Sequence, residues 1–118
     1  MRNPREVADA WVEAFNRGDA DAMVALYSED AVHTSPKLRA IQPGGEGRIR
    51  GKAAMKGWWQ DAFERRPGIQ YEVLTIVASD EVAVIEYLRH SPGRDTMQVA
   101  EVFEIRDGLI VRSHVYQG

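Results

Sequence analysis

The sequence predicts one α+β domain, with helices in its first half and an antiparallel β-sheet in its second half. Apolar residues recur at the helical spacing of three and four as far as Arg66. After Pro67-Gly68 they alternate with the period of two that is typical of strands. The length of 118 residues suits a single domain, residues 1–118, that can bury a core of its own.

Three helices are expected in the first half of the chain. Asn3 is a good N-cap for the first helix and Pro4 suits its first position, while Gly18 suits the left-handed conformation that ends a helix. Asp19 caps a short second helix, and a third helix is expected over residues 51–66.

A short strand from Ala31 to Thr34 and a Gly- and Pro-rich loop over residues 35–47 are expected between the second and third helices. Loops of this length are often lids or binding loops. Four strands follow, over Ile69–Ala78, Val82–His90, Asp95–Arg106 and Leu109–Tyr116. They are expected to form a curved sheet over the helices, a cone whose hollow interior suits a small molecule.

Composition excludes several function classes. The chain has no cysteine, which excludes disulfides, thiol nucleophiles and Cys-ligated zinc. Its 15 basic and 18 acidic residues give a net charge of −3, which argues against nucleic acid as a partner. No leader-like or membrane-length apolar run is present, so a cytoplasmic protein with no membrane partner is expected. No metal-ligand spacing and no cofactor motif occurs, so neither group is expected.

Glu101 is the most informative residue of the sheet. It lies on the apolar phase of its strand, between Val99 and Phe103. A carboxylate in such a position is costly unless it is paired, or protonated through a raised pKa. Glu101 is therefore the first candidate for a general acid or base.

The hairpin that follows supplies candidate partners for Glu101. With Asp107-Gly108 as a two-residue turn, Glu101 is expected to face His114, with Tyr116 and Arg112 one step to either side. A carboxylate–imidazole pair is then expected on the inner face. The alternative is a structural pair, or one on a convex surface or a dimer interface.

The preceding turn adds a second carboxylate. If Ser91 pairs with Arg94, Glu86 faces Val99 and lies diagonal to Glu101, an arrangement that pushes the two pKa values apart. A slip of one residue would turn Glu86 outward.

Aromatic residues complete the expected site. Trp58 and Trp59 are adjacent on a helix, so only one can face the core squarely and the other can line the cavity mouth or a partner interface. Core packing is the alternative to a role in the site. The predicted catalytic residues are Glu101, His114 and Tyr116. Ligand contacts are expected from Trp11, Tyr27, His33, Trp58, Trp59, Glu86, Val99, Phe103 and Arg112.

Three runs of the chain carry a family resemblance: WVEAFNRGDADAMVALYSEDAVHTSP, GRIRGKAAMKGWWQDAF and VAEVFEIRDGLIVRSHVYQ. They resemble the SnoaL-like branch of the nuclear transport factor 2-like superfamily, which includes ketosteroid isomerases, polyketide cyclases and limonene epoxide hydrolases. The resemblance implies a cystatin-like roll with a pocket between sheet and helices, and a homodimer. It leaves the activity open, because the fold hosts many chemistries.

Compared with ketosteroid isomerases, the resemblance is partial. Those enzymes carry an oxyanion-donating Tyr where this chain has Trp11, and an Asp base where it has Ser35 before Pro36. Glu101 takes the place of their protonated Asp. Polyketide cyclases of the family are the better match, because they can rely on one carboxylate on the sheet.

Three hypotheses follow for the function. The first is an enzyme without a cofactor, an isomerase, cyclase or hydrolase that uses Glu101 on a small, largely apolar carbonyl or epoxide-type substrate. The second is a pocket protein that binds a small ligand without catalysis. The third is a dimeric interaction module. A homodimer is expected through the outer face of the sheet, with Val102, Leu74, Ile76, Ile85 and Tyr87 on that face.

Overall fold

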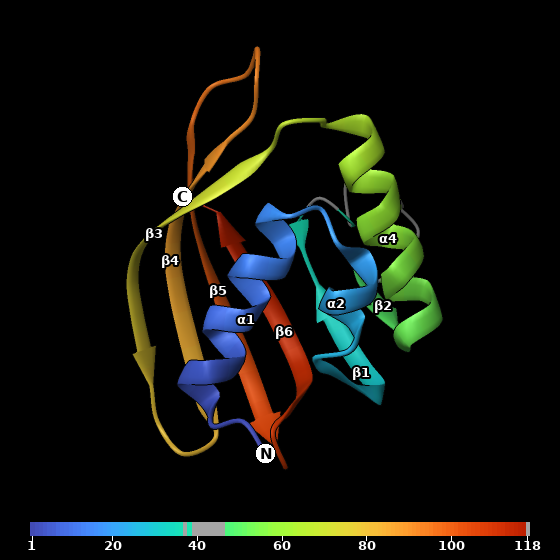
Figure 1. Ribbon diagram of the computed structural model, residues 1–118, viewed down its shortest axis with the longest axis vertical. Coiled ribbons are helices and arrows are strands. Elements are labelled where there is room, and N and C mark those ends of the chain that lie inside the picture. Colours follow the sequence, from blue (N-terminus) through green and yellow to red (C-terminus); the bar gives the residue numbers. More distant parts are fainter. Residues whose placement is uncertain (37, 39–46, 118) are drawn as a thin grey trace.

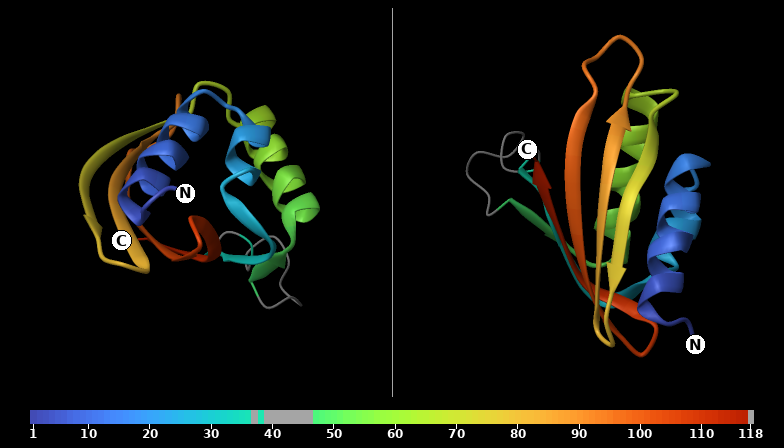
Figure 2. Two further views of the ribbon diagram at one scale, coloured as in Figure 1. Left: turned by 60° about the horizontal axis from the view of Figure 1, so that its bottom comes forward. Right: turned by 90° about the vertical axis from the view of Figure 1, so that its left-hand side faces the viewer.

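The computed structural model describes residues 1–36, 38 and 47–117. Its helices pack against the concave face of a curved sheet (Figures 1 and 2), which confirms the predicted α+β class. In the described residues the helices are α1 (Pro4–Asn16), α2 (Ala20–Val24) and α4 (Lys52–Arg65). The strands are β1 (Tyr27–Thr34), β2 (Arg48–Arg50), β3 (Gln70–Ala78), β4 (Val82–His90), β5 (Met97–Arg106) and β6 (Leu109–Gln117).

The sheet is mixed, with the six strands in the order β2-β1-β6-β5-β4-β3. The run from β3 to β6 is the predicted antiparallel meander. The sequence did not predict β2, the early start of β1, or the parallel pairing of β1 with β6. Most of the predicted loop over residues 35–47 lies outside the described residues.

α1 forms where its caps predict. The Asn3 side chain accepts a bond from the Glu6 backbone N–H at 2.9 Å, and the Glu6 side chain accepts one from the Asn3 N–H at 3.0 Å. One stripe of the helix, which includes Trp11 and Phe15, is buried against the sheet. None of the described helices is long and apolar enough to cross a membrane.

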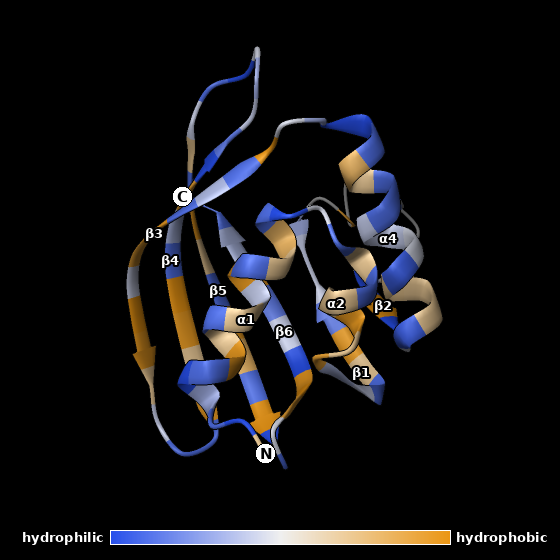
Figure 3. Cartoon of the chain, in the orientation of Figure 1, coloured by the Kyte–Doolittle hydropathy of each residue, from blue (hydrophilic) through white to orange (hydrophobic). Residues whose placement is uncertain are grey.

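Aromatic rings fill the space between α1 and the sheet. Phe15 stacks on Tyr71 with ring centroids 3.6 Å apart, and Tyr71 stacks on Tyr87 at 4.1 Å. Trp11 packs beside Phe103 at 5.2 Å. Hydrophobic residues recur along the strands and along α1 (Figure 3). The buried ones on both elements form one cluster, so the core lies inside the curve of the sheet.

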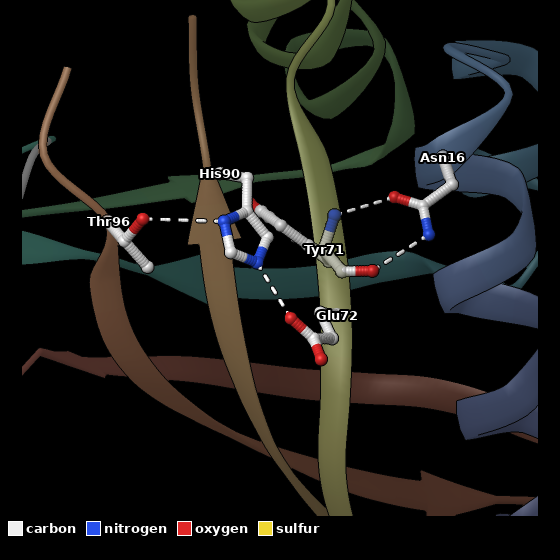
Figure 4. Close-up of polar contacts among 5 residues, drawn as sticks. All are labelled: Asn16, Tyr71, Glu72, His90 and Thr96. Atoms are coloured by element: carbon white, nitrogen blue, oxygen red, sulfur yellow. Dashed lines mark hydrogen bonds and ion pairs between the residues drawn. The ribbon is translucent and has the colours of Figure 1, made fainter.

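Asn16, at the end of α1, holds the edge strand β3 in place (Figure 4). Its amide donates to the Tyr71 carbonyl at 3.0 Å and accepts from the Tyr71 N–H at 2.8 Å. The side chain thus pairs with the strand as a neighbouring backbone would. Glu72, the residue after Tyr71, contacts the His90 ring, and the other nitrogen of that ring contacts Thr96.

The β5–β6 hairpin corrects the predicted partner of Glu101. Near the turn, Ile105 pairs with Ile110 as expected. One extra residue then bulges from β6, and from there the register is shifted by one, so that Glu101 pairs with Val115. His114 pairs with Val102 on the outer face.

The β4–β5 register also differs from the prediction by one residue. Glu101 pairs with Ile85, while Glu86 pairs with Ala100 on the outer face. Ile85 and Tyr87 are buried inside the curve, and Ile76 pairs with Ile85 there. Their prediction as outer-face residues is therefore wrong.

Candidate functional site

A cavity lies between the C-terminal half of α4, α1 and the inner face of the sheet. It offers about 70 Å³ to the centre of a water-sized sphere, enough for several waters or a small organic group. Six of the predicted site residues line it: Trp11, His33, Trp58, Trp59, Val99 and Glu101.

Glu101 reaches this cavity from β5 and is only 1% exposed. Its Oε1 accepts a hydrogen bond from the Tyr87 hydroxyl at 3.1 Å. Its Oε2 is buried and has no hydrogen-bond partner among the described residues. Burial raises the pKa of Glu101 from its ordinary 4.5 to about 8, although the bond from Tyr87 lowers it. Glu101 is therefore mostly a neutral carboxylic acid at pH 7.

Two tyrosines extend the site beyond Glu101. Tyr87 and Tyr71 line the cavity, and their rings stack with centroids 4.1 Å apart. Burial, and after it the charge of an ionised Glu101, raises the pKa of both phenols. Both stay protonated across the physiological range. The two hydrogen bonds between Asn16 and the Tyr71 backbone hold Tyr71 in place at this wall of the cavity.

His33 brings an imidazole to the same cavity from β1. Its Nδ1 lies 2.7 Å from Ser113 Oγ, and the residue is 3% exposed. Burial, and after it the charge of His114, lowers the pKa of His33 from 6.5 to about 4. The ring is neutral at pH 7. Because Ser113 occupies Nδ1, Nε2 is the nitrogen left for a ligand.

Tyr27 and Phe103 support the cavity from behind. Both are fully buried and neither contributes to the lining. The Tyr27 hydroxyl accepts a bond from Trp11 Nε1 at 3.1 Å and lies 3.5 Å from Ser113 Oγ. These contacts orient the Trp11 ring, which does line the cavity.

The remaining predicted residues lie on the opposite face of the sheet. His114 contacts Thr34 Oγ1 at 2.7 Å and is 3.7 Å from Glu104. Tyr116 is 59% exposed. Arg112 lies 3.8 Å from Glu104, and Glu86 accepts bonds from Thr75 and Gln98. The bulge in β6 and the shift in β4 turn His114, Tyr116, Arg112 and Glu86 away from the cavity.

Sequence reasoning missed the other residues of the cavity wall, among them Tyr71, Tyr87, Arg66 and Arg89. Tyr87 continues the apolar phase of Ala83 and Ile85, and this phase could have identified it as inward-facing. The arginines carry no comparable signal, because charged residues at the ends of elements usually face water.

The cavity combines a proton donor with a proton acceptor. A neutral carboxylic acid can donate to an oxygen that gains negative charge, and a neutral imidazole can accept a proton from carbon or oxygen. Within the described ranges no three acidic or imidazole side chains gather as they would around a metal ion.

Comparison with known proteins places the chain in a family. A search of curated protein sequences gives no match. The solved structures include many similar folds, some named for the nuclear transport factor 2-like or cystatin fold. A SnoaL-like protein of unknown function from Burkholderia thailandensis is 24% identical, with a TM-score of 0.84 over 98% of this chain and 94% of that one.

Two further structures have names that suggest an activity. A candidate polyketide cyclase from Streptomyces antibioticus, IdmH, is 22% identical, with a TM-score of 0.79 over 98% of this chain and 92% of that one. A candidate ketosteroid isomerase from Kribbella flavida is 21% identical, with a TM-score of 0.81 over 98% of this chain and 77% of that one. At these identities the likeness shows the fold alone. The model of the SnoaL-like domain matches residues 8–113, and the chain therefore belongs to the SnoaL-like domain family.

Proposed function

We propose that this protein is an enzyme that needs no cofactor and moves a proton on a small, largely apolar carbonyl compound, as an isomerase or a cyclase does. One observation carries the proposal. Glu101 lines the cavity, and one oxygen of its buried acid, Oε2, has no partner among the described residues. Leaving a buried polar atom unpaired costs roughly 1–3 kcal/mol, which a substrate oxygen at that position would recover.

The reaction follows from the two protonation states. The substrate carbonyl oxygen accepts a hydrogen bond from the acid of Glu101, and Nε2 of His33 takes a proton from the neighbouring carbon. The enolate that forms is stabilised by Glu101, because a positioned donor in a dry site acts most strongly on developing charge. Return of the proton to another carbon completes an isomerisation. Attack of the enolate carbon on a second carbonyl forms a carbon–carbon bond and an alkoxide, which takes the proton held by His33 and completes a cyclisation.

The roles differ from those expected for His114 and Tyr116. Both lie outside the cavity, whereas Tyr87 supplies the hydrogen bond to Glu101 and His33 supplies the imidazole. The names of the cyclase and isomerase among the similar structures support the reaction class.

Proton exchange at carbon tests the proposal directly. The probe is 2-tetralone, an apolar ketone whose α-protons exchange with D₂O and can be followed by NMR. The wild-type protein should accelerate exchange over buffer. Glu101→Gln should keep the fold and lower the rate by roughly 10²–10⁴-fold, the usual contribution of one acid–base group.

Glu104→Gln is the matched control, because it makes the same change in the same strand on the outer face, and it should leave the rate unchanged. The pH profile of the wild type should rise as His33 loses its proton near pH 4 and fall as Glu101 ionises near pH 8. Full activity of Glu101→Gln would remove Glu101 from the chemistry. A wild-type rate equal to that of buffer would favour a protein that only binds its ligand.

A further inference from the structure

Arginines gather on one wall of the cavity. Arg65 is the last residue of α4, Arg66 follows it, and Arg89 lies near the end of β4; all three line the cavity. Arg94, in the turn after β4, is close enough to act on the charge of Arg66. The chain as a whole has a net charge of −3, so this positive wall is a local feature.

The fold brings these arginines together by packing two turns against each other. The turn after α4 closes with a bond from the Ile69 N–H to the Arg66 carbonyl at 3.2 Å. The β4–β5 turn closes with a bond from the Arg94 N–H to the Ser91 carbonyl at 3.0 Å. Gly68, with φ +81°, lies so close to the second turn that an added Cβ would be 3.1 Å from Pro92 Cγ.

Carboxylates neutralise only part of this positive charge. Arg65 forms an ion pair with Asp61 at 2.8 Å. Arg66 and Arg89 have no ion pair within the described part of the chain, and a guanidinium nitrogen of Arg89 contacts only the sulfur of Met97, at 3.3 Å. Burial lowers the pKa of Arg66, and so do Arg89, Arg94 and Arg65, in that order. Tyr71, the smallest of the influences on this pKa, acts in the opposite direction, and no carboxylate of the described residues contributes.

The helix end accounts for only some of these residues. Cations at a helix C-terminus interact favourably with the helix dipole, which suits Arg65 and Arg66. Arg89 and Arg94 belong to a different hairpin, so the sequence of the helix does not account for them. Their approach to Arg66 costs repulsion, which an anion bound between them would relieve.

We propose that the cavity takes an amphipathic anion, whose apolar body lies among the aromatic residues and whose negatively charged head is held by Arg66 and Arg89. The proposal rests on the proposed function and names the class of its substrate. Carboxylate and phosphate heads share the chemistry that guanidinium groups recognise. Trp58 flanks the same wall, with the Arg65 guanidinium 5.9 Å from its ring centroid. Glu101 does not oppose an anion, because its neutral form prevails at pH 7.

Tryptophan fluorescence gives a direct readout, because all three tryptophans of the chain line the cavity. The probes are cyclohexanecarboxylate, cyclohexyl phosphate and the neutral cyclohexanecarboxamide. We expect one of the anions to bind at least about 10-fold more tightly than the amide, by charge-assisted hydrogen bonds. The tighter of the two anions identifies the head group. Added salt should reduce the preference for the anion.

Arg66→Gln and Arg89→Gln should each weaken binding of the preferred anion by about 10-fold and affect the amide little. Arg106→Gln, at the exposed end of β5, is the matched control and should change neither. Equal binding of the amide and both anions by the wild type would overturn the proposal. So would equal weakening of amide and anion in the two variants, or the absence of saturable binding by either anion. Binding of an anion needs no turnover, and exchange of neutral 2-tetralone needs no anion, so the two proposals can fail separately.

Discussion

Glu101 links the stability of the fold to pH. Its pKa is about 8 when folded and near 4.5 when exposed, so the folded state holds a proton that the unfolded state loses between these values. The free energy of unfolding therefore falls as the pH rises from about 4.5 to about 8, in total by a few kcal/mol. Below that window both states are protonated, and above it both are ionised.

His33 contributes with the opposite sign. Its pKa is near 6.5 when exposed and about 4 when folded, so its contribution to stability is complete above pH 6.5 and is lost as the pH falls towards 4. The two residues oppose each other between about pH 4.5 and 6.5. Glu101 acts without this opposition between about pH 6.5 and 8.

Glu101→Gln should remove the Glu101 part of this dependence. We expect the free energy of unfolding in urea to fall for the wild type, relative to the variant, as the pH rises from about 6.5 to 8. The reason is that glutamine cannot ionise. Glu104→Gln is the control, and its stability should follow that of the wild type. A constant difference between wild type and Glu101→Gln across this range would mean that Glu101 is already ionised in the folded protein at pH 6.5.

Local pattern was enough to find Glu101 and not enough to find its neighbours. A carboxylate that interrupts an apolar phase can be recognised from its own strand. Its cross-strand partner depends on register, and the bulge in β6 has no signature in that strand. Ile110 is held at the start of β1, because its N–H donates at 2.8 Å to the carbonyl of Leu26, the residue before that strand. This contact joins residues 84 positions apart, so the hairpin sequence alone could not reveal it.

At the scale of the elements, the link between α1 and β3 carries a prediction. Asn16→Ala removes both hydrogen bonds to the Tyr71 backbone and leaves those groups unpaired at a partly buried edge. We expect a loss of about 1–3 kcal/mol in the free energy of unfolding, measured with urea. Hydrogen exchange should also become faster in β3, because the edge strand loses its clamp.

Glu72→Gln is the control for Asn16→Ala. It changes the next residue of the same strand and weakens the exposed contact with His90, which is 2.8 Å long. Exposed ion pairs contribute about 0–1 kcal/mol, so this variant should be nearly as stable as the wild type. Equal losses in the two variants would show that the Asn16 bonds contribute no more than a surface contact.

Caps and turns made most elements predictable. The capping box of Asn3 and Glu6 identified the start of α1, and Asp107-Gly108 identified the turn of the last hairpin. β2 was not predicted, because its three residues, Arg48–Arg50, have no strand pattern of their own. It exists by pairing with β1, which is a tertiary effect.

At the scale of the whole molecule, the sequence predicted the curved sheet over helices but not its mixed character. The parallel pairing of β1 with β6 joins Val32 to Arg112 and Thr34 to His114. No turn connects these segments, so no local signal reports their contact. This pairing also places His33 beside Ser113, and with it half of the candidate acid–base pair.

The outer face of the sheet leads to the last prediction, a homodimer. Val77, Val84 and Val102 lie side by side across β3, β4 and β5 on that face, and Tyr116 lies on β6 with 59% of its surface exposed. An apolar band of this kind is typical of a surface that is covered by a partner. We expect light scattering at micromolar concentration to give twice the chain mass of 13.3 kDa.

Val102→Arg should convert this dimer into a folded monomer. The Val102 side chain is half-buried on the outer face, so an arginine there can reach water in the monomer. In a dimer the arginine would lie against its own symmetry copy or against apolar surface, and both contacts are unfavourable. Leu109→Arg makes the same kind of change at an exposed leucine beside the β5–β6 turn, away from the valine band, and should leave the mass unchanged. A wild type that scatters as a monomer would contradict the prediction. A dimer that survives Val102→Arg would place the interface elsewhere. If that interface lay on the inner side of the sheet, where the cavity opens, the chemistry of the cavity would depend on the partner chain.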